Sequence, residues 1–193
     1  MDFQKMYKNV RGWAGAHGIR VGLSLLPAGK AGEFDGLSAT MNSEYEPEEV
    51  VYYLTHALGS IVRWSLSRPE VQKMFDEMRA AKKGDERNRL EQAIKAYRAF
   101  EEESSEFAVW LLAELGHTGV VPSYTNFMRA DLQALTEFHR NGRAAVWREF
   151  FARWNEDVTA GRKQGLSFRP KPIPPFEPVL IEKQEILQEH GGN

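Results

Sequence analysis

The segment Tyr52–Trp64, with the sequence YYLTHALGSIVRW, decides the fold of this chain. With about 100° between successive residues, a helix over this segment has an apolar side that faces the core. This side carries Val50, Leu54, Ala57, Ile61 and Trp64. A polar group borders it, with His56 and Ser60 one turn apart, Tyr53 beside them and Arg63 at the same edge. A polar group at the border of a buried face is where a binding cleft is expected.

Two patterns compete for the start of this helix. Ser43 and Glu46 have the spacing of a capping box. Pro47 suits the first turn of a helix and disfavours helical geometry at the residue before it. We therefore expect the helix to begin at Pro47 and to end near Ser67, before a second helix that starts at Pro69.

Upstream of Pro47, the spacing of apolar residues changes from helical to strand-like. The pattern over residues 3–17 predicts a helix, and we expect Gly18 to end it. Apolar residues then alternate in residues 21–25 and again in residues 34–42, which predicts two short strands. These strands indicate a hairpin or the edge of a small sheet, with a bulge or a second turn at Asp35-Gly36.

Downstream of the second helix, the spacing predicts three more helices. A long helix is expected over Asp85–Leu115, with Gly116, Gly119 and Pro122 ending it. Two shorter helices are expected over Phe127–Arg140 and Ala144–Asp157. The predicted fold class is therefore α+β, mostly helical, with a small N-terminal sheet packed on a helix pair.

The last part of the chain has a different composition. Residues 166–181, LSFRPKPIPPFEPVLI, carry five of the nine prolines and are predicted to be extended. A short helix over Ile181–His190 is expected to close the chain. We predict one domain over residues 1–163 and a Pro-rich tail over residues 164–193. The tail is expected to lie across its own domain; a ligand for a proline-binding module is the alternative.

One acid stands among the apolar residues of the long predicted helix. Glu101 falls on its apolar side, whereas Glu102, Glu103 and Glu106 point away. That side carries Leu90, Ile94, Tyr97, Ala108, Leu112 and Leu115. A carboxylate there is costly unless a cation, a proton or several donors accompany it. A pair with His56 would satisfy both groups without a metal. Gly59, in the first helix, would let another element pack closely.

These features together resemble the ImmA/IrrE-like zinc peptidases. That family carries a strand ending in Asn, a helix with T-L-A-H-E-L-G-H, and a later helix with E-x-E-A-x-x-F-A-x-x-L-L. The matching segments here are GLSATMN at 36–42, LTHALGS at 54–60 and EEESSEFAVWLL at 101–112. Their order and character agree over Val21–Leu112. The resemblance implies a metallopeptidase fold.

The departures from the family motif concern the zinc site itself. In H-E-x-x-H the two His bind zinc and the Glu activates the attacking water. Here His56 is retained, Ala57 replaces the Glu, and Ser60 replaces the second His. Glu101 matches a position that could supply the third ligand, although Glu103 also fits the E-x-E pattern. The resemblance therefore implies lost zinc chemistry, with His56 and Glu101 as vestigial ligands and no catalytic residue.

We therefore expect a non-catalytic relative of zinc peptidases that binds or regulates a peptide or protein partner. Its site would be lined by Tyr53, His56, Ser60, Arg63 and Glu101. One alternative is a divergent hydrolase in which His56 serves Ser60 as nucleophile, although no nucleophile elbow is visible. Another is a zinc enzyme that recruits a further ligand, such as His117.

Composition excludes several other classes. Lys+Arg number 25 and Asp+Glu 27, a net charge of −2, so a strongly basic nucleic-acid-binding protein is not indicated. The absence of Cys excludes disulfides, thiolate metal sites and a Cys nucleophile. No signal peptide and no apolar run near the ~20 residues of a membrane helix are present, which predicts a cytoplasmic protein.

Overall fold

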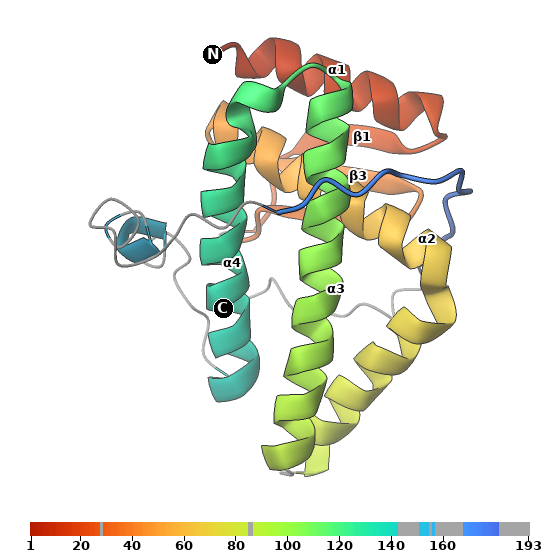
Figure 1. Ribbon diagram of the computed structural model, residues 1–193, viewed down its shortest axis with the longest axis vertical. Helices are drawn as coiled ribbons and strands as arrows, with labels where there is room; N and C mark the ends of the chain where they lie inside the picture. The colour runs from red at the N-terminus through yellow and green to blue at the C-terminus, as the bar shows by residue number, and fades with distance from the viewer. Residues whose placement is uncertain (28, 85–86, 143–150, 155, 157–167, 182–193) are drawn as a thin grey trace.

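Helices form most of this computed structural model, and a small sheet lies near the N-terminus (Figure 1). The structure describes residues 1–27, 29–84, 87–142, 151–154, 156 and 168–181. This arrangement confirms the α+β class. In chain order the elements are α1 Phe3–Ala16, β1 Arg20–Ser24, β2 Gly32–Phe34, β3 Ser38–Asn42, α2 Pro47–Gly84, α3 Arg87–Glu114, the 3-10 helix η1 Thr118–Val120, and α4 Val121–Asn141.

The sheet has the strand order β1-β3-β2. β1 pairs with β3 in parallel, from Arg20 opposite Ser38 to Ser24 opposite Asn42, and β2 pairs with β3 antiparallel. The two predicted strand segments therefore share one sheet, as expected. A hairpin between them is wrong, because β1 and β3 run in the same direction and β2 lies between them in sequence.

A tight turn at Asp35-Gly36 separates β2 from β3. The Asp35 carboxylate accepts hydrogen bonds from the backbone N–H groups of Leu37 (2.9 Å) and Ser38 (2.7 Å). Gly36 has φ +84°, which residues with a side chain rarely adopt. The expected single strand over 34–42 is therefore two strands, and the second-turn alternative at Asp35-Gly36 is correct.

The helix that carries His56 begins at Pro47, as expected, and not at the capping box of Ser43. Ser67 interrupts α2 with non-helical angles (φ −145°, ψ 39°), two residues before Pro69. The ring of Pro69 removes a backbone donor and clashes with the preceding turn, which explains the break. Figure 1 shows the helix changing direction there.

α3 and α4 differ from the expected helices mainly at their ends. α3 ends at Glu114, and Gly116 then has φ +78°. The expectation that Pro122 ends the long helix is wrong, because Pro122 lies in the first turn of α4, which begins at Val121 and not at Phe127. Proline suits this position, where its missing N–H has no helical partner to lose. The predicted helices over 144–157 and 181–190 fall largely outside the described residues.

The first half of α2 packs closely against the second half of α3. A Cβ atom added to Gly59 would lie 2.1 Å from the backbone oxygen of Ser104, so the helices touch through their backbones at this point. This contact confirms the interpretation of Gly59. One apolar cluster joins α1, the sheet and this region, and a second joins the far half of α2 to the near half of α3.

Residues 168–181 lie against the helices in extended conformation, crossing α3 (Figure 1). The Lys171 N–H donates to the backbone oxygen of Glu106 (3.2 Å), and the Ile181 N–H donates to that of Asp35 (2.8 Å). Phe168 and Ile181 are buried. Within the described part of the chain, no helix combines the length and apolar character needed to cross a membrane.

Candidate functional site

α2 places His56 at the border of its buried side. The predicted core face is buried: Val50, Leu54, Ala57, Ile61 and Trp64. His56 lies on the flank of this face, and 13% of its side chain is exposed. The helical periodicity therefore directs its imidazole along the surface of α2 toward α3.

α3 supplies the partner of His56. The carboxylate Oε2 of Glu101 lies 2.6 Å from His56 Nε2, and only 10% of the Glu101 side chain is exposed. This contact confirms the prediction that Glu101 is buried and within hydrogen-bond reach of His56. Because a carboxylate has only acceptors, Nε2 carries the hydrogen of this bond. Glu103 instead pairs with Arg63, so Glu101 is the acid that the fold brings to the motif histidine.

A third residue of the site, Ser105, was not predicted. Its Oγ lies 3.4 Å from His56 Nδ1 and donates to the backbone oxygen of Glu101 (2.9 Å). Both ring nitrogens of His56 therefore have a partner on α3. In the sequence, Ser105 is one residue of the matching segment 101–112, and no role was predicted for it. Its spacing could have identified it, since Ser105 follows Glu101 by one helical turn and lies on the same face of the helix.

Tyr53 belongs to the same buried region but pairs with α4. Its hydroxyl donates to Oδ1 of Asp131 (3.4 Å). Burial raises the pKa of Tyr53 well above its ordinary value, and the negative charges near it, chiefly that of Asp131, add to this rise. Asp131 was missed from the sequence, although it stands on the buried face of α4, one turn from Phe127.

Tyr124, on α4, is fully buried near both carboxylates. Burial raises its pKa well above the ordinary value; the Ser105 hydroxyl opposes this rise, and the charges of Glu101 and Asp131 add to it. The hydrogen bond of His56 with Glu101 joins α2 to α3, and that of Tyr53 with Asp131 joins α2 to α4, within one set of buried and half-buried polar side chains. We call it the polar cluster: Tyr53, His56, Glu101, Ser105, Tyr124 and Asp131.

Ser60 and Arg63 are the two remaining predicted site residues. Ser60 is buried (2% exposed), and the hydroxyl that faces His56 belongs to Ser105. Arg63 forms ion pairs with Glu103 and with Glu70 (3.3 Å). Glu103 also pairs with Lys171 from the extended segment, so these residues form a charged rim next to the polar cluster.

One imidazole and one carboxylate, those of His56 and Glu101, come together in this site. Zinc takes four protein ligands in structural sites and three with a water in catalytic ones. Within the described ranges, no group of three His, Cys, Asp or Glu side chains is arranged to hold a metal ion. The side chain of His117 contacts Asn9 of α1 (3.1 Å). At His56 the described residues therefore bring together one imidazole and one carboxylate.

Comparisons of the chain with protein-family models, with curated proteins and with solved structures give no match. The function of this chain is therefore inferred from the residues of the site and their contacts.

Proposed function

We propose that this protein is a non-catalytic relative of the ImmA/IrrE-like zinc peptidases that binds a peptide or protein partner. The observation that carries the proposal is the 2.6 Å contact between His56 Nε2 and Glu101 Oε2. In the motif that the sequence resembles, these positions hold zinc. Here each group is the hydrogen-bond partner of the other.

The other motif positions support the same conclusion. Ala57, at the position of the general base, has no group that accepts a proton, and it is 5% exposed. Ser60, at the position of the second His, offers a neutral hydroxyl, which is a poor zinc ligand. A general base usually contributes about 10²–10⁴ to the rate, so its replacement alone removes most of the motif's chemistry.

The partner, in this proposal, contacts the edge of α2 beside the polar cluster. His56 and Arg63 keep 13% and 17% of their side chains exposed there, and Glu103 and Lys171 add charges of both signs. A rim of this kind offers donors and acceptors to a peptide backbone and to charged side chains.

A hydrolase is less well supported, although Ser105, His56 and Glu101 form a Ser–His–acid sequence of contacts. A nucleophilic serine needs its proton directed to the histidine and an open path to substrate. Ser105 instead donates to the backbone oxygen of Glu101 and is 2% exposed.

A restored motif tests the relation to zinc peptidases. In the double variant Ala57→Glu/Ser60→His, zinc is expected to bind through His56, the introduced histidine and Glu101, as measured by metal analysis. Ala57→Glu alone is expected to restore nothing, and Ser60→His alone to restore metal binding without cleavage. Adding His56→Ala to the double variant is the matched control and should remove the zinc. A correctly folded double variant without zinc would contradict the proposed ancestry.

Partner binding has its own test. Peptides selected from a random displayed library on the unmodified protein are expected to bind Arg63→Ala about tenfold more weakly, a loss of about 1.4 kcal/mol. Arg98→Ala, which removes an exposed arginine of α3 instead of the α2 arginine, should leave their affinity unchanged. Failure to select any peptide, or equal affinities for both variants, would contradict peptide binding at this rim.

A further inference from the structure

β1 lies at one edge of the sheet in the described part of the chain, because the strand order is β1-β3-β2. At its start, the Arg20 N–H donates to the backbone oxygen of Leu37 (3.0 Å). At its end, the backbone oxygen of Ser24 accepts from the Ser43 N–H (2.9 Å). Both residues therefore direct their backbone groups to the side of β3. In a parallel ladder, these directions alternate along the strand.

The alternation leaves the backbone N–H and C=O groups of Val21 and Leu23 directed away from β3, toward the edge. Within the described residues, no strand lies beside them there. Edge strands are commonly protected by a charged residue, a proline or a bulge. The sequence VGLSL at 21–25 has no charge and no proline, and Leu23 and Leu25 are 51% and 68% exposed. This edge is therefore open to pairing with another extended chain.

Exposed cations lie on and beside this strand. Arg20 belongs to β1, and Lys8 and Arg11 are on α1, which leads into β1 and contacts it (Figure 1). Among the residues that the structure describes, none of these three cations has an acid as an ion-pair partner. Glu33, on the opposite edge strand, pairs with Lys30 (2.6 Å). The β1 edge therefore has positive charge that an acidic partner would complement.

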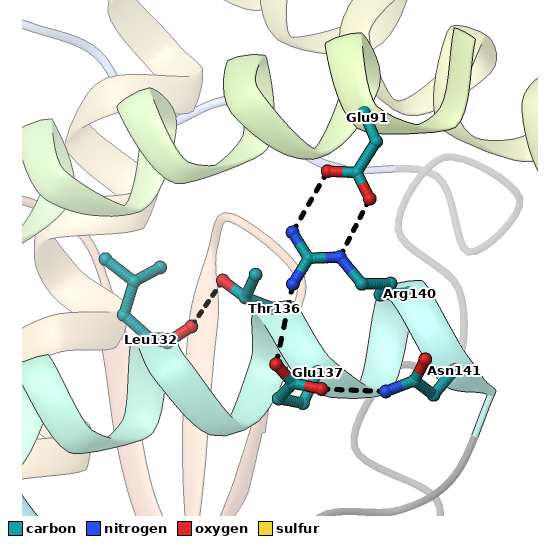
Figure 2. A network of polar contacts seen from close by, with 6 residues as sticks. All are labelled: Glu91, Leu132, Thr136, Glu137, Arg140 and Asn141. Carbon is teal, nitrogen blue, oxygen red and sulfur yellow. Dashed lines mark hydrogen bonds and ion pairs between the residues drawn. The ribbon is translucent and has the colours of Figure 1, made fainter. Parts of the chain in front are cut away.

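Arg140, an arginine of α4, shows the contrast. Figure 2 shows its guanidinium facing Glu91 of α3, with Nε to Oε1 at 2.8 Å and the second pair of atoms at 3.0 Å. Glu137 adds a contact at 3.5 Å. The charge of Arg140 is thus compensated inside the chain by two acids, which is not the case for the cations at β1.

We propose that the β1 edge binds an acidic peptide in extended conformation, which adds to the sheet as a further strand. Its backbone would pair with the N–H and C=O groups of Val21 and Leu23, as in other complexes formed by strand addition. Its acidic side chains would lie opposite Arg20 and near Arg11. A nucleic acid would satisfy the charges but not the backbone groups, so the peptide is favoured. This surface is separate from the polar cluster, and the proposal does not depend on the function proposed for that cluster.

The two faces of β1 define the probe. The side chains of Val21 and Leu23 face the helices, since their partners on β3, Ala39 and Met41, are buried. Arg20 faces the opposite side. A peptide that alternates valine and glutamate matches both faces, so acetylated and amidated Val-Glu-Val-Glu-Val-Glu is titrated by NMR at fixed ionic strength. It should bind saturably and shift the amide signals of β1, whereas Val-Lys-Val-Lys-Val-Lys should not bind.

Two N-methylated forms of this peptide test the backbone pairing without changing the protein. One carries its methyl groups on the valine nitrogens, the other on the glutamate nitrogens. Only alternate N–H groups of an added strand face β1. One form should therefore bind like the parent and the other about tenfold more weakly or worse. Antiparallel addition predicts the loss for the valine form, and parallel addition for the glutamate form. Equal affinities of the two forms would overturn the proposal.

Variants of the chain locate the site. Arg11→Gln/Arg20→Gln is expected to weaken binding about tenfold, whereas Lys95→Gln/Arg98→Gln, which removes the same charge from exposed residues of α3, should not. Leu23→Pro removes an N–H that faces the edge and keeps the bonds to β3, so it should also weaken binding. Equal weakening by the α3 control, no saturable binding of the acidic peptide, or tighter binding of single-stranded DNA at β1 would contradict the proposal.

Discussion

The His56–Glu101 contact places an imidazole and a carboxylate together in the interface between two helices. A hydrogen bond to a charged group in such a place is stronger than one between neutral groups at the surface. Its loss also leaves the remaining group in poorly solvated surroundings. At the scale of single residues, this contact therefore affects both stability and the proposed function.

A double-mutant cycle measures the contact. His56→Ala is expected to lower the free energy of unfolding by about 1–3 kcal/mol, because the Glu101 carboxylate loses its imidazole partner. Replacing both residues with leucine should cost less than either single leucine substitution, since no polar group is then left behind. Urea unfolding gives all of these values. Additive effects of the two leucine substitutions would show that the residues do not interact.

The buried tyrosines predict a loss of stability at alkaline pH. The pKa of Tyr124 is raised in the folded protein, above the ~10 of an unfolded chain. Above that unfolded value, the unfolded state releases its proton while the folded state retains it, so rising pH favours unfolding. Tyr124→Phe should therefore become more stable relative to the unmodified protein between about pH 8 and pH 11. An identical stability difference at both pH values in urea unfolding would contradict this.

At the scale of elements, the close approach of α2 and α3 positions the polar cluster. Gly59 permits it, because any side chain at this position meets the Ser104 backbone. Helix–helix contacts of this kind fix which residues face each other across the interface. The pairing of His56 with Glu101 therefore depends on a residue that has no polar group of its own.

Gly59→Ala should destabilise the protein by about 1–3 kcal/mol, because the helices must separate to admit a methyl group. Gly12→Ala in α1 is the matched control. No atom lies within 4 Å of the added Cβ, so this change should stabilise by up to about 1 kcal/mol through helix propensity. Thermal unfolding of both variants measures the two effects. Effects of the same sign would mean that the Gly59 contact is not tight.

Helix starts and breaks were predicted well where the residues that cause them lie close by in the sequence. The start of α2 at Pro47 and its break at Ser67 follow from proline chemistry within a few residues. The parallel pairing of β1 with β3 was missed, because pairing joins residues far apart in the chain. Pro122 was misread because proline both ends helices and begins them.

In the candidate site, the pair of His56 and Glu101 was predicted from the sequence, whereas Ser105 and Asp131 were not. Glu101 stood out because an acid on an apolar face needs a partner, and His56 was the residue available to it. Ser105 and Asp131 carry weaker signals, since a serine in a helix can bond the backbone one turn earlier and the partner of Asp131, Tyr53, lies on another helix. Which side chains face each other across helices is set by packing and not by local sequence.

At the scale of the whole molecule, residues 168–181 connect distant parts of the structure. Phe168 is 3% exposed, and the guanidinium of Arg129 from α4 lies 4.1 Å from its ring centre. Phe176 stacks on His17, the residue that follows α1, with ring centres 5.5 Å apart, and on Trp13 of α1. The segment thus contacts α4, α3, α1 and the β2–β3 turn in succession, which predicts a contribution to global stability.

Phe168→Ala is expected to lower the free energy of unfolding by about 3 kcal/mol, as for a buried aromatic residue. Leu180→Ala, at a position that is 49% exposed, should change it by less than about 0.5 kcal/mol. Deletion of residues 166–193 should lower the melting temperature. An unchanged melting curve for the deletion would indicate a free arm that seeks a partner.

We propose that His56 and Glu101 are hydrogen-bond partners of each other and not zinc ligands. The zinc content of the unmodified protein, purified without chelators and measured by elemental analysis, tests this most directly. We expect zinc far below one ion per chain and no zinc-dependent cleavage of a mixed peptide library. One zinc per chain, lost in His56→Ala together with such cleavage, would contradict it.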